Sequence, residues 1–385
     1  MISVCIPVKN GGDLFRDNLQ RLKQQRVSEP VEFVVLDSGS EDETVETARA
    51  LGARVYSIPP REFNHGESRN RLAELAGGDV LVFTVQDATP VGDNFLQELV
   101  RPLKEDPTLA GVYGQQIPRS DADPVTRWEI ELNNRCFSIG QRKKRISSGA
   151  EFLQLDLTRR LDAVTFDNTC SSMPRKVWQD FRFSRIEFAE DIDWAFRVLT
   201  QGGVIFHNPA AFVYHSHCYT PFSRLRRHFI SEYVIRRIVQ MPPGDLPGRP
   251  YEELAAIYGF AREVGRLCQR LMRAAADVSK IEQPRNPMIA LQRLLRKLNQ
   301  PALNRFAFSQ LPGLLRADLR VHFDFLVKEI LAKHVPMSAE KVVAILRQIE
   351  AYVIGDFLGQ YYYSLAARNG LAFWQKEMVR ILLAG

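Results

Sequence analysis

Short apolar runs alternate with amphipathic segments over about the first 115 residues. Such alternation is typical of βαβ units that form a mostly parallel sheet. Strands are expected at the runs ISVCIPV, VEFVVL, ARVYSI, DVLVFTV and AGVYGQ. One helix between them is expected to open at Ser40, with Glu43 three residues later as in a capping box. Short right-handed crossovers bring the carboxyl ends of the strands to one edge, where sheets of this kind bind ligands.

The pattern is less regular over about residues 116 to 220. A helix is predicted from near Glu190, with Gly202 as its stop. The apolar run VIFHNPAAFVYH that follows predicts a further strand.

A stretch rich in proline and glycine, MPPGDLPGRP at residues 241–250, predicts a domain boundary. Residues 1–240 are expected to form an α/β domain with halves at 1–115 and 116–240, and residues 251–385 a helical domain. Apolar residues of this second domain recur at helical spacing, at Leu254, Ile257, Tyr258, Ala261, Val264, Cys268, Leu271 and Ala275. Four arginines form a separate stripe, made of Arg262, Arg266, Arg270 and Arg273.

Composition and charge narrow the class of protein. With 385 residues, 45% of them hydrophobic, the chain can bury the cores of two domains. The net charge of +6 is too small and too dispersed to indicate a nucleic-acid-binding protein, but it permits an anionic substrate or membrane surface. The five cysteines lack the spacing of a zinc site or disulfide framework, which favours buried thiols in a reducing compartment. No run approaches the roughly 20 apolar residues of a membrane span, and no signal peptide is evident, so a cytoplasmic protein is expected.

Two carboxylates follow predicted strands. Asp37 ends the second strand, where it can accept hydrogen bonds from a nucleotide base or ribose, although the same residue types form simple turns. Asp87 and Gln86 follow the run VLVFTV, which reads as a central strand buried on both faces. A carboxylate there can hold Mg²⁺ or Mn²⁺ that bridges two phosphates, and a turn or helix cap is the competing interpretation.

Charged residues at two predicted helix starts are further candidates. Arg69 has a planar fork that suits phosphate oxygens, although a lone arginine is more often a solvated surface residue. The segment AEDIDWAFR places Glu190, Asp191 and Asp193 at a helix start, where acidic side chains offset the helix dipole. An ionised aspartate there can also serve as a general base for an attacking hydroxyl. The spacing alone leaves both interpretations open.

Two histidines flank Ser216 directly after the last predicted strand of this region. Alternate residues of a strand point to one side, so His215 and His217 would face one site if the strand continued. One of them could then complete the ligand shell of a cation. Without an acidic partner in the local sequence, a role outside metal binding is the commoner outcome for such a pair.

Together these segments resemble the family 2 glycosyltransferases, enzymes of the GT-A fold, over about residues 1–220. SVCIPVKN is similar to the family's first strand, LDSGSEDET to its D-[DN]-G-S-x-D-x-T turn, SRN to its A-R-N segment and AEDID to its E-D-x-D helix. The resemblance implies a Rossmann-like GT-A domain with a nucleotide-binding half at 1–115 and an acceptor half at 116–240. It implies Asp191 as catalytic base, Asp37 against the base of the nucleotide and Arg69 against the diphosphate. The implied donor-binding residues are Pro7, Val8, Asn10, Asp37, Ser38, Arg69, Gln86 and Asp87.

One motif departs from the family pattern. The fourth strand usually ends in Asp-x-Asp, whereas this chain has Val85, Gln86 and Asp87. Binding of Mg²⁺ or Mn²⁺ by two carboxylates is therefore in doubt, and His215 gains weight as a ligand beside Asp87. Further candidate site residues are His65, Glu190 and His217.

FNHG before SRN, QDA at the strand end and HSH after the last strand are similar to the bacterial rhamnosyltransferase branch of the family. This resemblance implies inverting transfer of L-rhamnose from dTDP-L-rhamnose to a glycan or polyprenyl-linked acceptor, in surface polysaccharide synthesis at the inner face of the cytoplasmic membrane. The arginine stripe could then rest on anionic lipid, together with Arg224, Arg226, Arg227, Arg236 and Arg237, a solvated helix face being the commoner explanation.

Other function classes stay open at this stage. A glycosyltransferase with another donor, such as a UDP-sugar, and a non-catalytic protein that binds nucleotide sugars or acts as a scaffold both fit the sequence. A dinucleotide-dependent oxidoreductase would need G-x-G-x-x-G after the first strand, where VKNGGD stands instead. A nucleotidyltransferase usually has a glycine-rich basic loop there, of which only Lys9, Gly11 and Gly12 give a hint.

Overall fold

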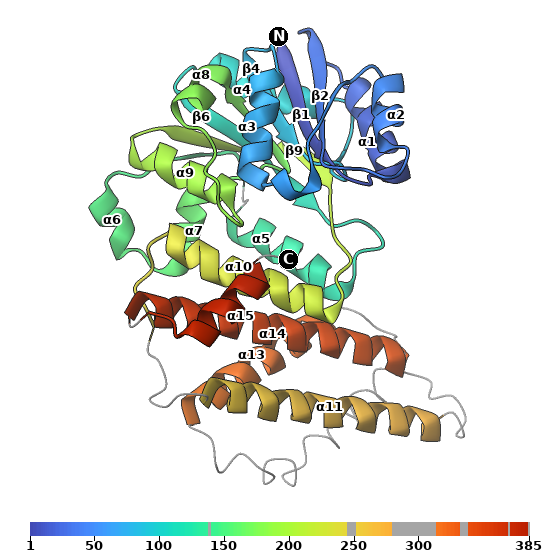
Figure 1. The fold of residues 1–385 in the computed structure, drawn as a ribbon, viewed down its shortest axis with the longest axis vertical. Helices are drawn as coiled ribbons and strands as arrows, with labels where there is room; N and C mark the ends of the chain where they lie inside the picture. The colour runs from blue at the N-terminus through green and yellow to red at the C-terminus, as the bar shows by residue number, and fades with distance from the viewer. Residues whose placement is uncertain (138–139, 245–251, 279–312, 332–337, 369, 384–385) are drawn as a thin grey trace. The chain divides into compact units, whose positions relative to one another are not determined.

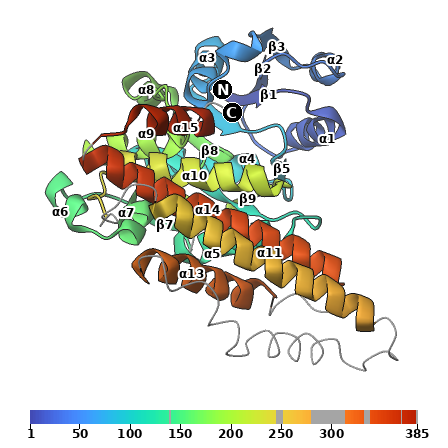
Figure 2. The ribbon, with the colours of Figure 1, turned by 60° about the horizontal axis from the view of Figure 1, so that its bottom comes forward.

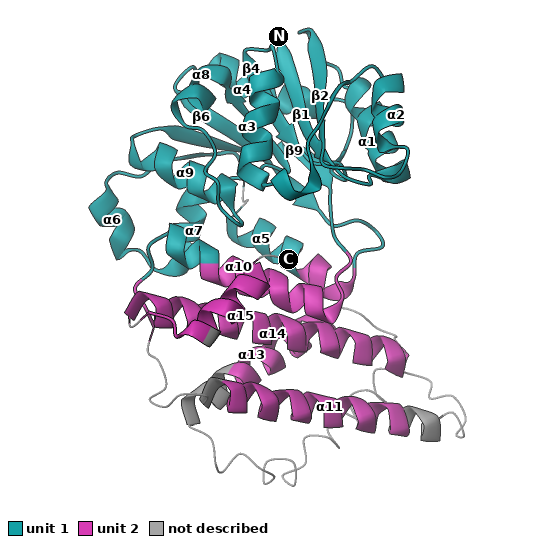
Figure 3. Ribbon diagram, in the orientation of Figure 1, with its two compact units in different colours: residues 1–122, 129–217, 234–241 teal, residues 123–128, 218–233, 242–385 magenta. Residues whose placement is uncertain are grey.

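The computed structural model describes residues 1–137, 140–244, 252–278, 313–331, 338–368 and 370–383 (Figure 1). These residues divide into two compact units (Figure 3). The first consists of residues 1–122, 129–217 and 234–241, and the second of residues 123–128, 218–233 and 242–385. Most of the predicted boundary stretch, residues 245–250, lies outside the described residues. The division also falls within helices α5 (Pro124–Phe137) and α10 (Pro221–Ile238), so the predicted limits at 240 and 251 stay a prediction.

In the described part of the chain, nine strands form the sheet of the first unit, in the order β3-β2-β1-β4-β8-β6-β9-β5 with β7 paired to β9. All six predicted strands are present, as β1 (Ile2–Val8), β2 (Val31–Asp37), β3 (Arg54–Ser57), β4 (Val80–Thr84), β6 (Leu109–Ile117) and β9 (Val204–Tyr214). Three short strands have no predicted counterpart, namely β5 (Thr89–Pro90), β7 (Arg142–Lys144) and β8 (Cys170–Pro174).

The six predicted strands all run in one direction. Strand β8 lies between β4 and β6 and pairs antiparallel with both, while β9 runs parallel to β6. The prediction of a mostly parallel sheet is therefore confirmed, with β8 inserted antiparallel near its centre and the short strands β5 and β7 also antiparallel, each paired with β9. As a result, the carboxyl ends of β1, β2, β4, β6 and β9 meet the amino end of β8 at one edge of the sheet.

Helices cover both faces of this sheet. Because successive strand residues point to opposite faces, Val4 and Ile6 of β1 join one core cluster and Cys5 joins the other. The first cluster includes helices α1 (Gly12–Lys23), α2 (Thr44–Ala50) and α4 (Phe95–Glu105). The second includes helices α3 (His65–Leu75), α8 (Arg175–Asp180) and α9 (Glu190–Thr200). The remaining helices of the unit are η1 (Pro60–Glu62), α6 (Gly149–Gln154) and α7 (Leu157–Val164).

The second unit is helical, as predicted. Its helices α11 (Glu252–Val278), α13 (Gly313–Leu331) and α14 (Ala339–Arg368) pack against one another, and α15 (Phe373–Leu383) follows (Figure 2). Helix α10 approaches α14 so closely that a Cβ atom on Gly355 would lie 2.3 Å from the Leu225 carbonyl oxygen. Glycine is therefore required at this crossing.

The apolar stripe predicted for α11 is correct at Val264, Cys268 and Leu271, which are buried. It is wrong at Leu254 and Tyr258, which are 39% and 66% exposed. The buried residues before Val264 are Ala256 and Phe260. At about 100° per residue, Leu254 and Tyr258 lie about 80° and 120° around the helix axis from Val264, on the other side of it from the buried residues. The predicted stripe also includes Ala275, whose side chain lies outside the described residues.

Two expectations from the composition concern buried thiols and membrane-spanning segments. Cys5, Cys170 and Cys268 are buried free thiols, whereas Cys136 and Cys218 are exposed. Within the described ranges, every helix is too short or too polar to cross a membrane.

Candidate active site

The loop after β1 is held by side chains from the loops after β2 and β4. Asn10 has a left-handed backbone conformation, with φ of 48°. Its N–H donates to Ser40 Oγ at 2.8 Å, and its Oδ1 accepts from the Glu41 N–H at 2.8 Å. The Gln86 side-chain amide makes two hydrogen bonds to the backbone of Lys9. It accepts from the Lys9 N–H at 2.7 Å and donates to the Lys9 carbonyl oxygen at 3.2 Å. Such strained non-glycine residues persist where their surroundings fix them, and they cluster at functional sites.

Pro7 and Val8 are buried at the end of β1. Strand β1 stays paired with β2 as far as Val8 and Asp37, but its ladder with β4 ends earlier, at Cys5 and Phe83. Proline has no N–H with which to extend a ladder. Strands β1 and β4 therefore separate toward the edge of the sheet.

Asp37 and Ser38 form the turn after β2. The buried carboxylate of Asp37 accepts from the N–H groups of Gly39 and Ser40 at 3.1 and 3.0 Å. The Ser38 hydroxyl donates to the Val8 carbonyl oxygen at 3.2 Å. These bonds establish the turn role of Asp37, and its contact with a nucleotide base stays a prediction.

The predicted capping box at Ser40 and Glu43 is wrong. The Ser40 hydroxyl accepts the Asn10 N–H instead, and helix α2 begins only at Thr44, without a side-chain cap. A contact distant in the sequence has thus overridden the local helix signal.

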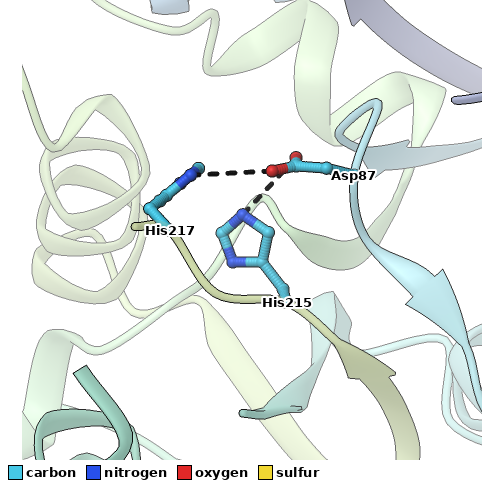
Figure 4. A group of neighbouring side chains, drawn as sticks. All are labelled: Asp87, His215 and His217. Carbon is cyan, nitrogen blue, oxygen red and sulfur yellow. Dashed lines mark ion pairs between the residues drawn. The ribbon is translucent and has the colours of Figure 1, made fainter. Parts of the chain in front are cut away.

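Asp87, His215 and His217 face one another at the ends of β4 and β9 (Figure 4). His215 Nε2 lies 3.5 Å from Asp87 Oδ1, and His217 Nδ1 lies 3.6 Å from Asp87 Oδ2. Strand β9 ends at Tyr214, so both imidazoles reach the carboxylate from a loop. Asp87 lies just before the short strand β5, which pairs with the end of β9, and this pairing brings the histidines the acidic partner that the local sequence lacks.

This group has the geometry of a cation site. Burial raises the pKa of the Asp87 carboxyl, but the neighbouring His215 and His217 side chains hold that pKa below its usual value. Octahedral bonds of about 2.1 Å, as Mg²⁺ prefers, meet at about 90° and hold their donor atoms about 3.0 Å apart. The separations found here exceed this value by about half an ångström, which a small movement of the side chains would close. Charge-assisted N–H···O hydrogen bonds are shorter, at about 2.7–2.9 Å. The three side chains therefore fit a divalent cation, whereas Val85 packs against the core and offers no ligand atom.

Arg119 also belongs to this group, although no motif indicated it. Its guanidinium donates to the Asp87 carbonyl oxygen and, at 3.2 Å, to Thr89 Oγ1. Its backbone N–H donates to Ser216 Oγ at 3.3 Å. Arg119 lies just beyond the end of β6, so attention to every strand end would have found it.

Arg69 and Glu190 form a buried ion pair at the start of α9. Arg69 Nη1 lies 2.9 Å from Glu190 Oε1, and the two side chains are 4% and 7% exposed. Burial raises the pKa of Glu190, but the charges of Arg69 and His65 and a hydrogen bond from Asn168 hold it below its usual value. Among the described residues the buried Arg69 Nε has no partner, which leaves a donor for a ligand oxygen. The predicted contact of Arg69 with a diphosphate stays a prediction.

Asp191 follows this pair in a strained turn. Ala189, the residue before the helix, has a left-handed conformation with φ of 60°. The Asp191 carboxylate accepts from the Asn168 N–H at 3.3 Å and from the Ile192 N–H at 2.8 Å. Burial and the negative charges of Glu190 and Asp167 raise the pKa of Asp191. A carboxylate with a raised pKa is a stronger proton acceptor, as a general base requires.

The other two candidates near this helix have peripheral places. Asp193 accepts from Ser184 Oγ at 2.6 Å and pairs with Arg197 Nε at 2.9 Å, which is a structural role. His65 is exposed at the start of α3, where its carbonyl oxygen accepts from Arg69 Nη1 at 3.1 Å.

A chain of hydrogen bonds links Asp191 to the Asp87 group. Gln116 bonds to His215 on one side and to Asp167 and Thr169 on the other. Asn168, between the last two residues, donates to Asp191. The segment 167–169 leads into β8, which carried no recognisable strand pattern, so sequence reasoning missed these residues. The two carboxylates expected to share a site therefore lie at the same edge of the sheet.

An edge where parallel strands end is the usual ligand site of α/β proteins, and here it carries a cation-type ligand set beside a base-type carboxylate. The model of the family described as Glycosyl transferase family 2 matches residues 3–177. The O-antigen chain rhamnosyltransferase RfbN of Salmonella typhimurium is 32% identical over 232 residues, which are 59% of this chain and 70% of the relative. The O-antigen chain rhamnosyltransferase WbaN of Salmonella anatum is 30% identical over 231 residues, again 59% and 70%. The chain belongs to glycosyl transferase family 2.

Solved structures show a more distant likeness. The mannosyltransferase PcManGT of Pyrobaculum calidifontis, solved with GDP-Man and Mn²⁺, shares 17% identity, with 77% of this chain and 79% of that chain covered and a TM-score of 0.46. Glucosyl-3-phosphoglycerate synthase of Mycobacterium tuberculosis, solved with Mn²⁺, UDP-glucose and glycerol 3-phosphate, shares 21% identity, with coverage of 63% and 82% and a TM-score of 0.43.

Proposed function

We propose that this family 2 glycosyltransferase transfers a sugar from a nucleotide diphosphate to an acceptor hydroxyl, with inversion at the anomeric carbon. The observation that carries the proposal is the convergence of two unlike groups on one sheet edge. Asp191, with its raised pKa, is the proposed base, and Asp87 with His215 and His217 is the proposed holder of Mg²⁺ or Mn²⁺.

In the proposed reaction the acceptor oxygen attacks the anomeric carbon while the bond from that carbon to the diphosphate oxygen breaks. The leaving diphosphate keeps the bonding electron pair, and the acceptor proton moves to the Asp191 carboxylate. A bound divalent cation would offset the negative charge that develops on the diphosphate. Arg69, through its free Nε–H, and Arg119, beside Asp87, are the proposed further contacts of the diphosphate.

The proposed donor is dTDP-L-rhamnose, and the proposed acceptor is a glycan or polyprenyl-linked glycan of a surface polysaccharide. The support is that two relatives of about 30% identity, each covered over 70% of its length, are named O-antigen chain rhamnosyltransferases. A UDP-sugar donor is the alternative within the enzyme class. Thermal unfolding with a panel of nucleotide sugars, with and without Mg²⁺ or Mn²⁺, tests the donor, because a ligand at 100 times its Kd adds about 2.7 kcal/mol of stability.

A transfer assay with the donor that stabilises the protein separates the enzyme from a non-catalytic binding protein. Release of nucleoside diphosphate that depends on an added glycan acceptor is the expected result. If the donor binds tightly but its sugar is transferred to no rhamnose-accepting or glucose-accepting glycan, the protein is a non-catalytic nucleotide-sugar-binding or scaffold protein.

We also propose contact with an anionic membrane through the arginine stripe of α11, made of Arg262, Arg266, Arg270 and Arg273. All four are exposed, and Tyr258 and Leu254 extend the same face. Basic and aromatic side chains on one helix face favour an anionic lipid surface. Two other arginines expected to join them do not fit: Arg224 is buried and pairs with Asp123 at 2.8 Å, and Arg226 donates to the Leu382 carbonyl oxygen at 2.8 Å.

A further inference from the structure

The orientation of the Gln116 side chain is fixed by its neighbours. Its Nε2 donates to Asp167 Oδ2 at 2.7 Å and to Thr169 Oγ1 at 3.2 Å. An ionised carboxylate only accepts hydrogen bonds, so the amide nitrogen of Gln116 must face Asp167. Asp167 is held in turn, because its Oδ1 accepts the Thr169 N–H at 2.9 Å. The amide oxygen of Gln116 consequently points at His215, with Oε1 2.7 Å from Nδ1.

This orientation dictates the tautomer of His215. An amide oxygen has no hydrogen to give, so His215 Nδ1 must carry the proton in this bond. In the neutral imidazole, Nε2 then holds a lone pair, and that lone pair faces Asp87 Oδ1 at 3.5 Å. Two hydrogen-bond acceptors directed at each other repel unless a proton or a metal cation lies between them, and a metal cation can take the place of the proton.

We propose that Gln116 is a positioning residue for the cation site, and that it acts by holding His215 in the Nδ1–H tautomer with the Nε2 lone pair turned to the metal. The inference rests on the metal part of the proposed function. His215 is nearly buried, so without Gln116 its Nδ1–H would have no acceptor and the imidazole would favour the opposite tautomer. Loss of such a supporting hydrogen bond typically weakens metal binding by about 10–100-fold.

The test uses the full chain without donor and measures Mn²⁺ affinity from the electron paramagnetic resonance signal of free Mn²⁺. Gln116→Ala should weaken Mn²⁺ binding by about 10–100-fold. Gln115→Ala is the matched control, because Gln115 is the neighbouring strand residue and points to the opposite face of β6. The Mn²⁺ affinity of this variant should stay at the native value. Imidazole ¹⁵N chemical shifts of His215 in metal-free protein should report the Nδ1–H tautomer in the native chain and its loss in Gln116→Ala.

A swap of donor and acceptor separates this role from a structural one. Asp167→Asn alone keeps an acceptor for the Thr169 N–H and places an amide N–H against the amide of Gln116. The Gln116 amide must then rotate, so that its own N–H points toward His215. Mn²⁺ affinity should therefore fall. Adding Gln116→Glu restores an acceptor for His215 and a donor for that acceptor at unchanged net charge, so affinity should return to within a few-fold of native.

Native Mn²⁺ affinity in Gln116→Ala, or an unaltered His215 tautomer, would overturn the role of Gln116 and leave the proposed function standing. Absence of Mn²⁺ binding by the native chain would instead remove the metal site itself, and this inference with it.

Discussion

Replacing Asp191 by Asn should lower the transfer activity and raise the stability of the protein. The carboxylate is the proposed proton acceptor, and an amide cannot take the proton of the acceptor hydroxyl. General bases contribute about 10²–10⁴-fold to rate, so kcat should fall by this factor, which is about 2.7–5.5 kcal/mol of activation free energy. Donor affinity should change little, because the proposed donor contacts are made by other residues.

Stability should rise in the same variant. The pKa of Asp191 is raised in the folded state, so the folded protein binds this proton more tightly than the unfolded chain does. Above the unfolded pKa near 4, the native protein therefore loses stability as pH rises toward the folded pKa. Asn carries no charge to bury, and each unit of the pKa shift corresponds to about 1.4 kcal/mol, so Asp191→Asn should gain at least about that much at pH 7.

The assays are nucleoside diphosphate release under saturating donor and urea unfolding monitored by tryptophan fluorescence. Transfer by the native enzyme should fall as pH drops through the raised pKa, at a higher pH than an ordinary aspartate would give. Asp193→Asn is the matched control: it lies on the same helix but pairs with Arg197, so transfer should persist and stability should fall by about 0–1 kcal/mol. Near-native turnover in Asp191→Asn, or joint loss of activity and stability, would refute the assignment.

Three further predictions address the neighbouring groups. Arg69→Met leaves the buried Glu190 charge unpaired and should lower the free energy of unfolding in urea by about 3–5 kcal/mol. The double variant Arg69→Met with Glu190→Gln should recover most of this loss, and equal losses in both variants would contradict the ion pair. Asp87→Asn removes the one carboxylate of the proposed ligand set and should weaken Mn²⁺ binding by at least about 100-fold in a spin-resonance titration, an unchanged affinity placing the cation elsewhere. Charge reversal of two arginines in the α11 stripe should abolish co-sedimentation with vesicles containing anionic lipid, at about 1 kcal/mol per charge removed, while reversal of the exposed Arg21 and Arg49 should not. Native protein that leaves such vesicles unbound would end the membrane proposal.

The hydrophobic pattern predicted those strands of the sheet whose burial is visible in their own sequence. Strands β1, β2, β4 and β9 are runs of apolar residues, and polar residues at their ends mark the edge of the sheet. Asp87 was found in this way, at the point where an apolar strand gives way to polar side chains. Parallel topology then placed these ends together without any knowledge of side-chain contacts.

Strand β8 was missed because two of its four buried residues, Ser171 and Ser172, are polar. The Ser172 hydroxyl donates to the Leu99 carbonyl oxygen at 2.7 Å, and the Ser171 hydroxyl donates to Asn168 Oδ1 at 2.9 Å. Burial of a hydroxyl is tolerated when such a partner exists, but the partner of Ser172 lies 73 residues away in the sequence. The same limit hid the role of Arg69, whose partner Glu190 belongs to a distant helix.

The ligand set at the sheet edge has a consequence for the charge of the site. An Asp-x-Asp pair brings two negative charges to a divalent cation and neutralises it, whereas Asp87 with two neutral imidazoles brings one. With a cation bound as proposed, the group would keep a net charge of about +1, and the Arg119 guanidinium beside Asp87 adds another. Such a site holds the free cation less strongly but attracts a diphosphate more strongly. Because coupling between two ligands is reciprocal, the donor should then tighten the cation by the same factor by which the cation tightens the donor. The loss of the first carboxylate therefore shifts the site toward joint binding of metal and nucleotide sugar, and it does not by itself imply a protein without catalytic activity.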